Sequence, residues 1–96
     1  MEPIARIVRM EQFLNEAWAA VKALDQALDR YAAARAGLTE LTAYYEDGRW
    51  MEDFEADAAG RLPQDLNRGV LSEDAVYNLL TDNAQLKERL RRLGKD

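Results

Sequence analysis

Four acidic side chains that lie close together in the sequence are the residues best suited to chemistry. They are Glu52, Asp53, Glu55 and Asp57. On a helix Asp53 and Asp57 stand four residues apart on one face, where their oxygen atoms could share a divalent cation. The same spacing is common on solvated helix faces, and no other type of ligand accompanies it. We therefore expect these carboxylates to be a solvated face or ion-pair partners, and we predict no bound metal.

The 96 residues contain no histidine and no cysteine. This composition excludes disulfides, the commonest zinc ligands and catalysis by an imidazole or a thiolate. Asp47-Gly48-Arg49-Trp50 lacks the alternating oxygen ligands of an EF-hand loop, and no Glu-x-x-His pair is present for a di-iron site. We predict no cofactor and favour a protein that is not an enzyme. The alternative is a small carboxylate-based metal-dependent protein or enzyme, which would use the acidic set with Tyr44, Tyr45 or Tyr77.

A second segment combines a cation, a flexible turn and a helix start within seven residues. It reads Arg68-Gly69-Val70-Leu71-Ser72-Glu73-Asp74. Arg68 lies where it could reach Asp53 or Asp57, which would make it a structural clamp. In the other interpretation, the Arg68 loop and the acidic helix form a recognition surface for a protein, or for a small anion at the helix N-terminus.

The negative charge of the chain is concentrated in its centre. The whole chain carries a formal charge of −5, whereas residues 40–65 hold eight acidic side chains against Arg49 and Arg61. Such a centre repels a phosphate backbone, so we predict no nucleic-acid partner. No segment has the roughly 20 apolar residues of a membrane span, and residues 1–10 do not resemble a signal peptide. The expected location is the cytoplasm, without a membrane partner.

The strongest structural signal is a helical stripe near the start of the chain. Its apolar residues recur in steps of three and four: Ile7, Met10, Leu14, Ala17, Val21, Leu24, Leu28 and Tyr31. Phe13 and Trp18 flank the stripe and widen its apolar face. Pro3 suits the first turn of a helix and Gly37 suits a C-terminal cap, so we predict a helix over residues 3–36.

The pattern of apolar and capping residues near the end of the chain predicts a second helix over residues 73–93. Ser72 suits its N-cap, and Arg91, Arg92 and Lys95 suit its C-terminal end. Its apolar face repeats the three-four spacing: Val76, Leu79, Asn83, Leu86, Leu90 and Leu93, with Leu80 alongside. Asn83 is either a half-exposed residue at the edge of this face or a buried amide that fixes register.

The residues between these helices predict two short helices and a pinned loop. Leu38, Leu41 and Tyr45 fit the first helix, which would end at Asp47-Gly48. The second would carry Trp50, Met51 and Phe54 and end near Gly60. Leu62-Pro63 then opens an extended connection with three apolar anchors, Leu66, Val70 and Leu71.

The predicted fold is therefore a single all-α domain over residues 1–96. Its long N-terminal helix packs antiparallel against the C-terminal helix, with Leu14, Val21, Leu24 and Leu28 in the core. The aromatic residues of the central segment are expected to join that core.

The central segment also resembles an uncharacterised bacterial family of small helical proteins, domain of unknown function 4298. The residues that carry the resemblance are Tyr44-Tyr45, Trp50, Asp53-Phe54-Glu55-Ala56-Asp57, Gly60, Leu62-Pro63, Arg68-Gly69-Val70-Leu71-Ser72-Glu73-Asp74 and Val76-Tyr77-Asn78-Leu79-Leu80. The opening residues 4–11 fit the family as well. The resemblance implies a stand-alone cytoplasmic protein and assigns no catalytic residue or ligand.

The favoured function is a protein–protein interaction or scaffolding module, because amphipathic helices commonly bind in the grooves of partners. The candidate interaction surface consists of Asp53, Glu55, Asp57, Arg68, Trp18 and Phe13. We further predict a homodimer of coiled-coil type. The N-terminal stripe is roughly 50 Å long and the C-terminal helix roughly 30 Å, at 1.5 Å per residue, so part of the stripe lies beyond the shorter helix.

Overall fold

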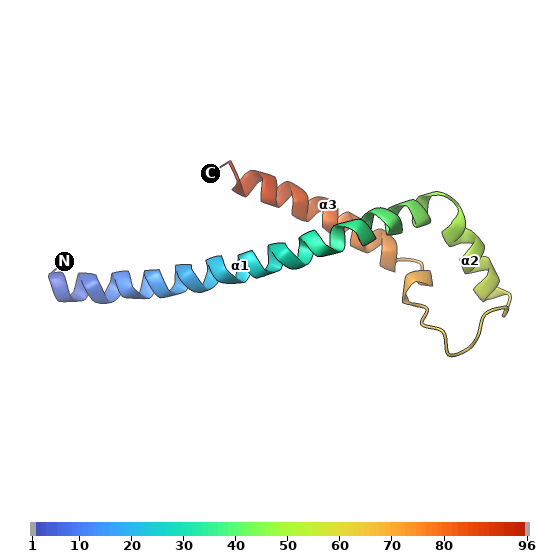
Figure 1. Cartoon of the computed structure of the whole chain (residues 1–96), viewed down its shortest axis with the longest axis horizontal. Coiled ribbons are helices and arrows are strands. Elements are labelled where there is room, and N and C mark those ends of the chain that lie inside the picture. Colours follow the sequence, from blue (N-terminus) through green and yellow to red (C-terminus); the bar gives the residue numbers. More distant parts are fainter. Residues whose placement is uncertain (1, 96) are drawn as a thin grey trace. The chain divides into compact units, whose positions relative to one another are not determined.

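The computed structural model of the chain describes residues 2–95, and its regular elements are helices (Figure 1). They are α1 (Pro3–Glu46), α2 (Arg49–Ala58), the short 3-10 helix η1 (Gly69–Leu71) and α3 (Ala75–Leu93). No strand is found in this described range. The predicted all-α class and the long N-terminal and C-terminal helices are confirmed.

Helix α1 begins where the sequence predicted but extends ten residues further. Its first turn is capped by the Glu2 carboxylate, which accepts hydrogen bonds from the amides of Ile4 (3.2 Å) and Ala5 (2.6 Å). Gly37 does not end the helix, because its φ is not positive and it forms no left-handed cap. The first of the two predicted short helices is therefore the last part of α1. The chain turns instead at Gly48, where φ is 98°.

The contacts of the chain divide it into two compact units, with the border between Ala36 and Gly37. The first unit holds the larger part of α1. The second holds residues 37–46 at the end of α1, together with α2, η1 and α3. In the second unit α3 runs opposite to this last part of α1, so the predicted antiparallel arrangement is confirmed there (Figure 1).

The apolar stripe of α1 is exposed. Leu14, Val21, Leu24 and Leu28, which the sequence predicted in the core, have between 45% and 65% of their surface exposed. No residue of α1 is buried. That prediction was wrong because the first unit consists of one helix, and a side chain of a helix is buried only where a second element covers it.

The core of the described residues lies in the second unit and centres on Trp50. Trp50, Leu71 and Val76 are buried. The Trp50 ring stacks on Phe54 at 5.1 Å between centroids and meets the Tyr45 ring edge-on at 5.5 Å. Its Nε1 donates a hydrogen bond to the Val70 carbonyl at 2.7 Å. The predicted structural role of the central aromatic residues is confirmed for these three rings.

The connection after α2 begins with a glycine cap of the Schellman type. Gly60 has φ 73°, its amide donates to the Asp57 carbonyl, and the Arg61 amide donates to the Ala56 carbonyl. Of the three expected apolar anchors of this loop, only Leu71 is buried. Leu66 and Val70 are exposed, and Val70 anchors the loop through its carbonyl.

Helix α3 begins at Ala75, two residues later than the sequence predicted. Asp74 occupies the N-cap position, whereas Ser72 is extended and its hydroxyl donates to the Gly69 carbonyl at 2.9 Å. The prediction that Ser72 caps this helix was therefore wrong. The covered face of α3 carries Val76 with three half-buried residues, Leu80, Asn83 and Leu90. Leu79 and Leu86 are exposed, so the buried face is rotated from the predicted one, and Asn83 is the predicted half-exposed residue.

We expect Trp50→Ala to lower the free energy of unfolding by about 3–5 kcal/mol, the usual cost of removing a buried aromatic side chain. Met51→Ala is the matched control, because Met51 is the next residue of α2 and is 50% exposed. It should change stability by no more than about 0.5 kcal/mol. Urea unfolding followed by circular dichroism at one protein concentration compares the two. Equal losses would contradict a core centred on Trp50.

Candidate functional site

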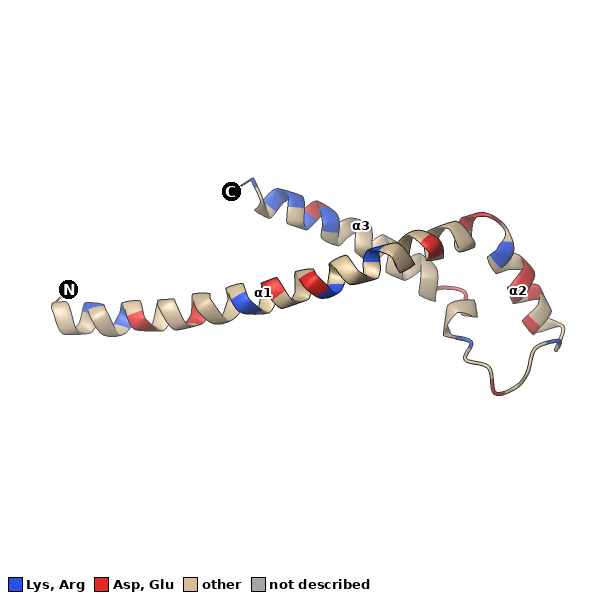
Figure 2. Ribbon diagram, viewed as in Figure 1, with Lys and Arg blue, Asp and Glu red and all other residues tan. Residues whose placement is uncertain are grey.

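Acidic residues, coloured red in Figure 2, follow one another closely along α2. The helix carries the four acidic residues of the predicted site, and each end of it has a group of polar contacts. At its start, Tyr44 forms a hydrogen bond with Asp53, and Arg49 forms one with Asp47. At its end, Asp57 meets Arg68 from the following loop. The contacts within these two groups indicate whether the acidic residues are arranged for catalysis, for metal binding or for structural links.

Tyr44 and Asp53 connect the end of α1 to α2. The Tyr44 hydroxyl donates to Asp53 Oδ2 at 2.6 Å. Arg49 lies over the Tyr44 ring, 5.6 Å from its centroid, and forms an ion pair with Asp47 at 2.8 Å between Nη2 and Oδ2. Asp53 is therefore held as a hydrogen-bond acceptor.

The protonation of Tyr44 follows from these neighbours. The pKa of Tyr44 is raised to about 12 by burial, by the hydrogen bond to Asp53 and by the negative charge of that carboxylate, while the charge of Arg49 acts in the opposite direction. Hydrogen bonds from Arg49 lower the pKa of Asp47. Tyr44 is thus a protonated donor near neutral pH, and it is poorly suited to act as a general base.

Arg68 clamps the loop that follows α2. Its Nε donates to Asp57 Oδ1 at 2.6 Å. Its terminal nitrogens donate to three main-chain carbonyls, those of Pro63 at 2.5 Å, Gln64 at 3.0 Å and Leu66 at 2.9 Å. Since a guanidinium has five N–H donors and makes four bonds here, little capacity remains for an external anion. The contacts support the clamp interpretation, with Asp57 as the partner.

The acidic residues do not converge on one point. Asp53 is bound to Tyr44 and Asp57 to Arg68, while Glu52 and Glu55 are exposed. Within residues 2–95, no three His, Cys, Asp or Glu side chains form a group that could hold a metal ion. The arrangement links α2 to the elements before and after it.

The six residues of the predicted interaction surface belong to different units. Asp53, Glu55, Asp57 and Arg68 are in the second unit. Phe13 and Trp18 are in the first, where they are 47% and 68% exposed. The Arg9 guanidinium lies 5.0 Å from the centroid of the Phe13 ring.

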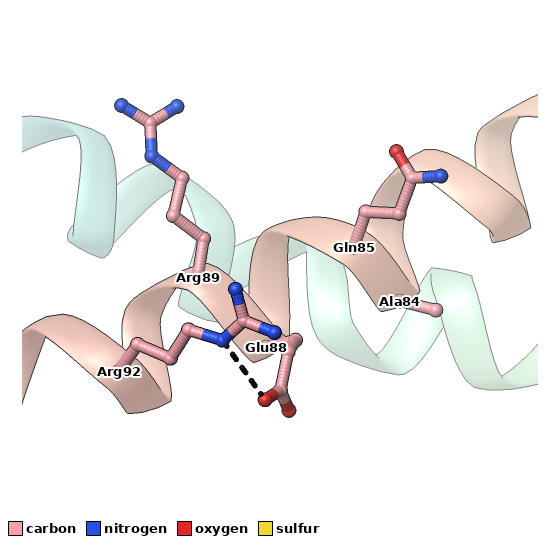
Figure 3. Close-up of a pocket in the computed structure, with 5 residues that line it drawn as sticks. All are labelled: Ala84, Gln85, Glu88, Arg89 and Arg92. Atoms are coloured by element: carbon pink, nitrogen blue, oxygen red, sulfur yellow. Dashed lines mark hydrogen bonds and ion pairs between the residues drawn. The ribbon is translucent and has the colours of Figure 1, made fainter.

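A group of charged residues near the end of α3 was not among the predicted site residues. A hollow of about 520 Å³ is lined by Ala84, Gln85, Glu88, Arg89 and Arg92 (Figure 3). Glu88 accepts from Arg92 Nε at 3.3 Å and forms an ion pair with Arg91 at 2.5 Å. The spacing of Glu88 to Arg91 and Arg92 was the available sequence signal. Because all five lining residues belong to one helix, the hollow is a surface feature rather than an enclosed pocket.

Comparison with known proteins identifies a family but no activity. The family model described as Domain of unknown function (DUF4298) matches residues 7–93. No curated protein and no solved structure matches the chain. Among the helices of residues 2–95, none has the length and apolar character needed to cross a membrane.

We expect Arg68→Lys to destabilise the loop, because lysine keeps the charge but cannot reproduce the fork of four hydrogen bonds. The loss of unfolding free energy should be about 1–3 kcal/mol, and proteolysis at residues 61–67 should become faster. Arg61→Lys, an exposed change in the same loop, is the control. Urea unfolding and limited proteolysis measure the two effects. Identical behaviour of the two variants would contradict the clamp.

We expect Asp53→Asn to lower the pKa of Tyr44 from about 12 toward its ordinary value of 10.0. The raised pKa stabilises the folded chain below the unfolded pKa near 10, and this contribution is lost as the pH rises from 10 toward 12. Ultraviolet titration of the phenolate, with Tyr44→Phe subtracted to isolate this residue, measures the shift. An unchanged Tyr44 titration in Asp53→Asn would show that the hydrogen bond does not control it.

Proposed function

Because the chain belongs to this family, whose description names no activity, we propose a function from its own residues: a non-enzymatic protein–protein interaction or scaffolding module. Its principal binding surface is the apolar face of α1 in the first unit. A module that needs no disulfide is suited to the cytoplasm, and the proposal places it there.

One observation carries this proposal: large apolar side chains are exposed along most of the first unit. Ten of them lie between Ile4 and Leu28, and their exposed fractions range from 45% to 72%. The ten are Ile4, Ile7, Val8, Met10, Phe13, Leu14, Trp18, Val21, Leu24 and Leu28. Full burial of one such side chain contributes about 1.5–3 kcal/mol, and an extended apolar patch on a protein surface usually marks an interface.

The composition of this face favours a protein partner. Two of its residues, Phe13 and Trp18, are aromatic, a class enriched at protein interfaces. Residues 2–36 carry five acidic and five basic side chains, so the unit has no net charge to attract a nucleic acid. The exposed acidic side chains of α2 form a separate, negatively charged surface, which would guide a basic partner rather than an acidic one.

The contacts of the carboxylates favour this proposal over a metal-dependent enzyme. Asp53 and Asp57, the pair best spaced for a shared cation, are hydrogen-bonded to different partners, Tyr44 and Arg68. A catalytic use of either carboxylate would first have to break a contact that links α2 to its neighbours.

We expect the double variant Leu14→Glu/Leu24→Glu to abolish protein binding, because burying two unpaired carboxylates in an interface is costly. Binding should weaken by at least about a hundredfold. Gln12→Glu/Gln26→Glu is the matched control, since it adds the same charge on the opposite face of the helix. Tagged forms of the three full-length chains are compared for self-association by light scattering and for capture of other proteins from the source lysate. Equal binding by both double variants, or no protein bound by the wild type, overturns the proposal.

A further inference from the structure

We propose that the occupant of the α1 face is a second copy of the same chain, and that the two α1 helices pair parallel and in register over residues 7–31. This inference rests on the proposed function, because it assumes that the apolar face binds a protein. It adds the identity of the partner, the direction of the pairing and the contacts that determine both.

The seam of this pairing follows a seven-residue repeat. Positions a of the repeat hold Ile7, Leu14, Val21 and Leu28, and positions d hold Met10, Ala17, Leu24 and Tyr31. Three and a half repeats are enough to indicate a coiled coil. Two a positions are β-branched and no d position is, a distribution that favours two strands over three or four.

The geometry of the first unit suits such a seam. Residues 7–31 lie within one uninterrupted helix, and this length corresponds to roughly 37 Å at 1.5 Å per residue. The six larger aliphatic residues of the seam, from Ile7 to Leu28, are between 45% and 65% exposed. An identical stripe of equal length would cover all of them, which is the self-complementarity that a two-fold dimer requires.

The residues beside the seam distinguish parallel from antiparallel pairing. In a parallel pair, a g position faces the e position five residues further along the second copy. Arg6 at g then faces Glu11 of the second copy at e, and two-fold symmetry makes this ion pair twice. Both side chains are exposed, and neither has an ion pair within residues 2–95.

The next pair along the same edge is aromatic. Phe13 at g faces Trp18 of the second copy at e, again twice by symmetry. Their exposed fractions in the single chain are 47% and 68%. The parallel arrangement therefore covers the two aromatic residues that flank the stripe, and covers each with the other.

Antiparallel pairing is disfavoured by charge. When two antiparallel copies overlap over the whole of residues 7–31, e positions face e positions. Glu11 then faces Asp25 of the second copy, and Asp25 faces Glu11. Like charges at such positions oppose association. The same two helices therefore gain two ion pairs in one direction and two repulsions in the other.

Light scattering of the full chain at micromolar concentration is the first test. The proposal expects a mass near twice the 10.9 kDa of one chain. A monomer mass, with Leu14→Glu/Leu24→Glu still abolishing capture of another protein, overturns this inference and leaves the proposed function in place. A dimer that the same double variant does not weaken overturns the seam.

Charge reversal then tests direction. Glu11→Arg replaces both ion pairs with repulsions in the parallel dimer and should raise its dissociation constant about tenfold at low salt. Arg6→Glu/Glu11→Arg should restore the native value. Glu16→Arg, the same charge change away from the flanking positions, is the control. Tighter association of Glu11→Arg would indicate antiparallel pairing and overturn the proposal.

Cross-linking gives an independent reading of direction, because the native chain has no cysteine. In the parallel dimer, Met10→Cys faces the same position of the second copy and should form a disulfide on mild oxidation. In the antiparallel dimer these two sites would be roughly 27 Å apart at 1.5 Å per residue. Gln12→Cys, on the outer face, should remain unlinked. Equal cross-linking of the two variants, or none in a confirmed dimer, contradicts parallel in-register pairing.

Discussion

The indole of Trp50 is the contact on which the second unit depends. Its ring touches Tyr45 at the end of α1 and Phe54 on its own helix, and its N–H reaches the carbonyl of Val70 beside η1. One side chain therefore connects three segments in a unit whose described residues include only three buried apolar side chains. The ring contributes buried apolar area, and its N–H group fixes the point at which the loop returns to the core, at the Val70 carbonyl.

The electrostatic contacts of α2 complete this arrangement. Tyr44 holds the beginning of the helix through Asp53, and Arg68 holds its end through Asp57. Carboxylates spaced four residues apart are thus used in two directions, one toward the preceding helix and one toward the following loop. Spacing that would suit a shared cation therefore serves two separate contacts here.

The first unit obeys a different constraint, since no part of it covers its apolar residues. A helix whose stripe remains exposed gains little from folding alone, and most helical stability in proteins comes from packing of the apolar face. The exposed stripe of the first unit and the small core of the second therefore both follow from how the apolar residues are distributed along the chain. In the proposed function, apolar residues before Gly37 serve association, and those after it build the core.

Sequence patterns predicted the elements of this chain better than their packing. The helical periodicity located α1 and α3, Gly60 marked the end of α2, and Arg68 was assigned a reach to Asp53 or Asp57, of which the structure has Asp57. Periodicity identifies an apolar face but contains no information on what covers it, so the stripe was wrongly assigned to the core. The expectation for Gly37 was wrong because glycine tolerates a left-handed conformation without requiring it, and at Gly37 φ is not positive and the helix continues.

The Arg68 clamp has a consequence for how this loop can vary among related chains. Three of its four bonds end on main-chain carbonyls, which every residue type provides. Exposed positions such as Gln64, Asp65 and Asn67 can therefore exchange side chains freely without loss of the loop's shape. The shape of the loop depends instead on a few positions, among them Trp50, Asp57, Gly60 and Arg68, so the outer surface of the segment can change while its path stays constant.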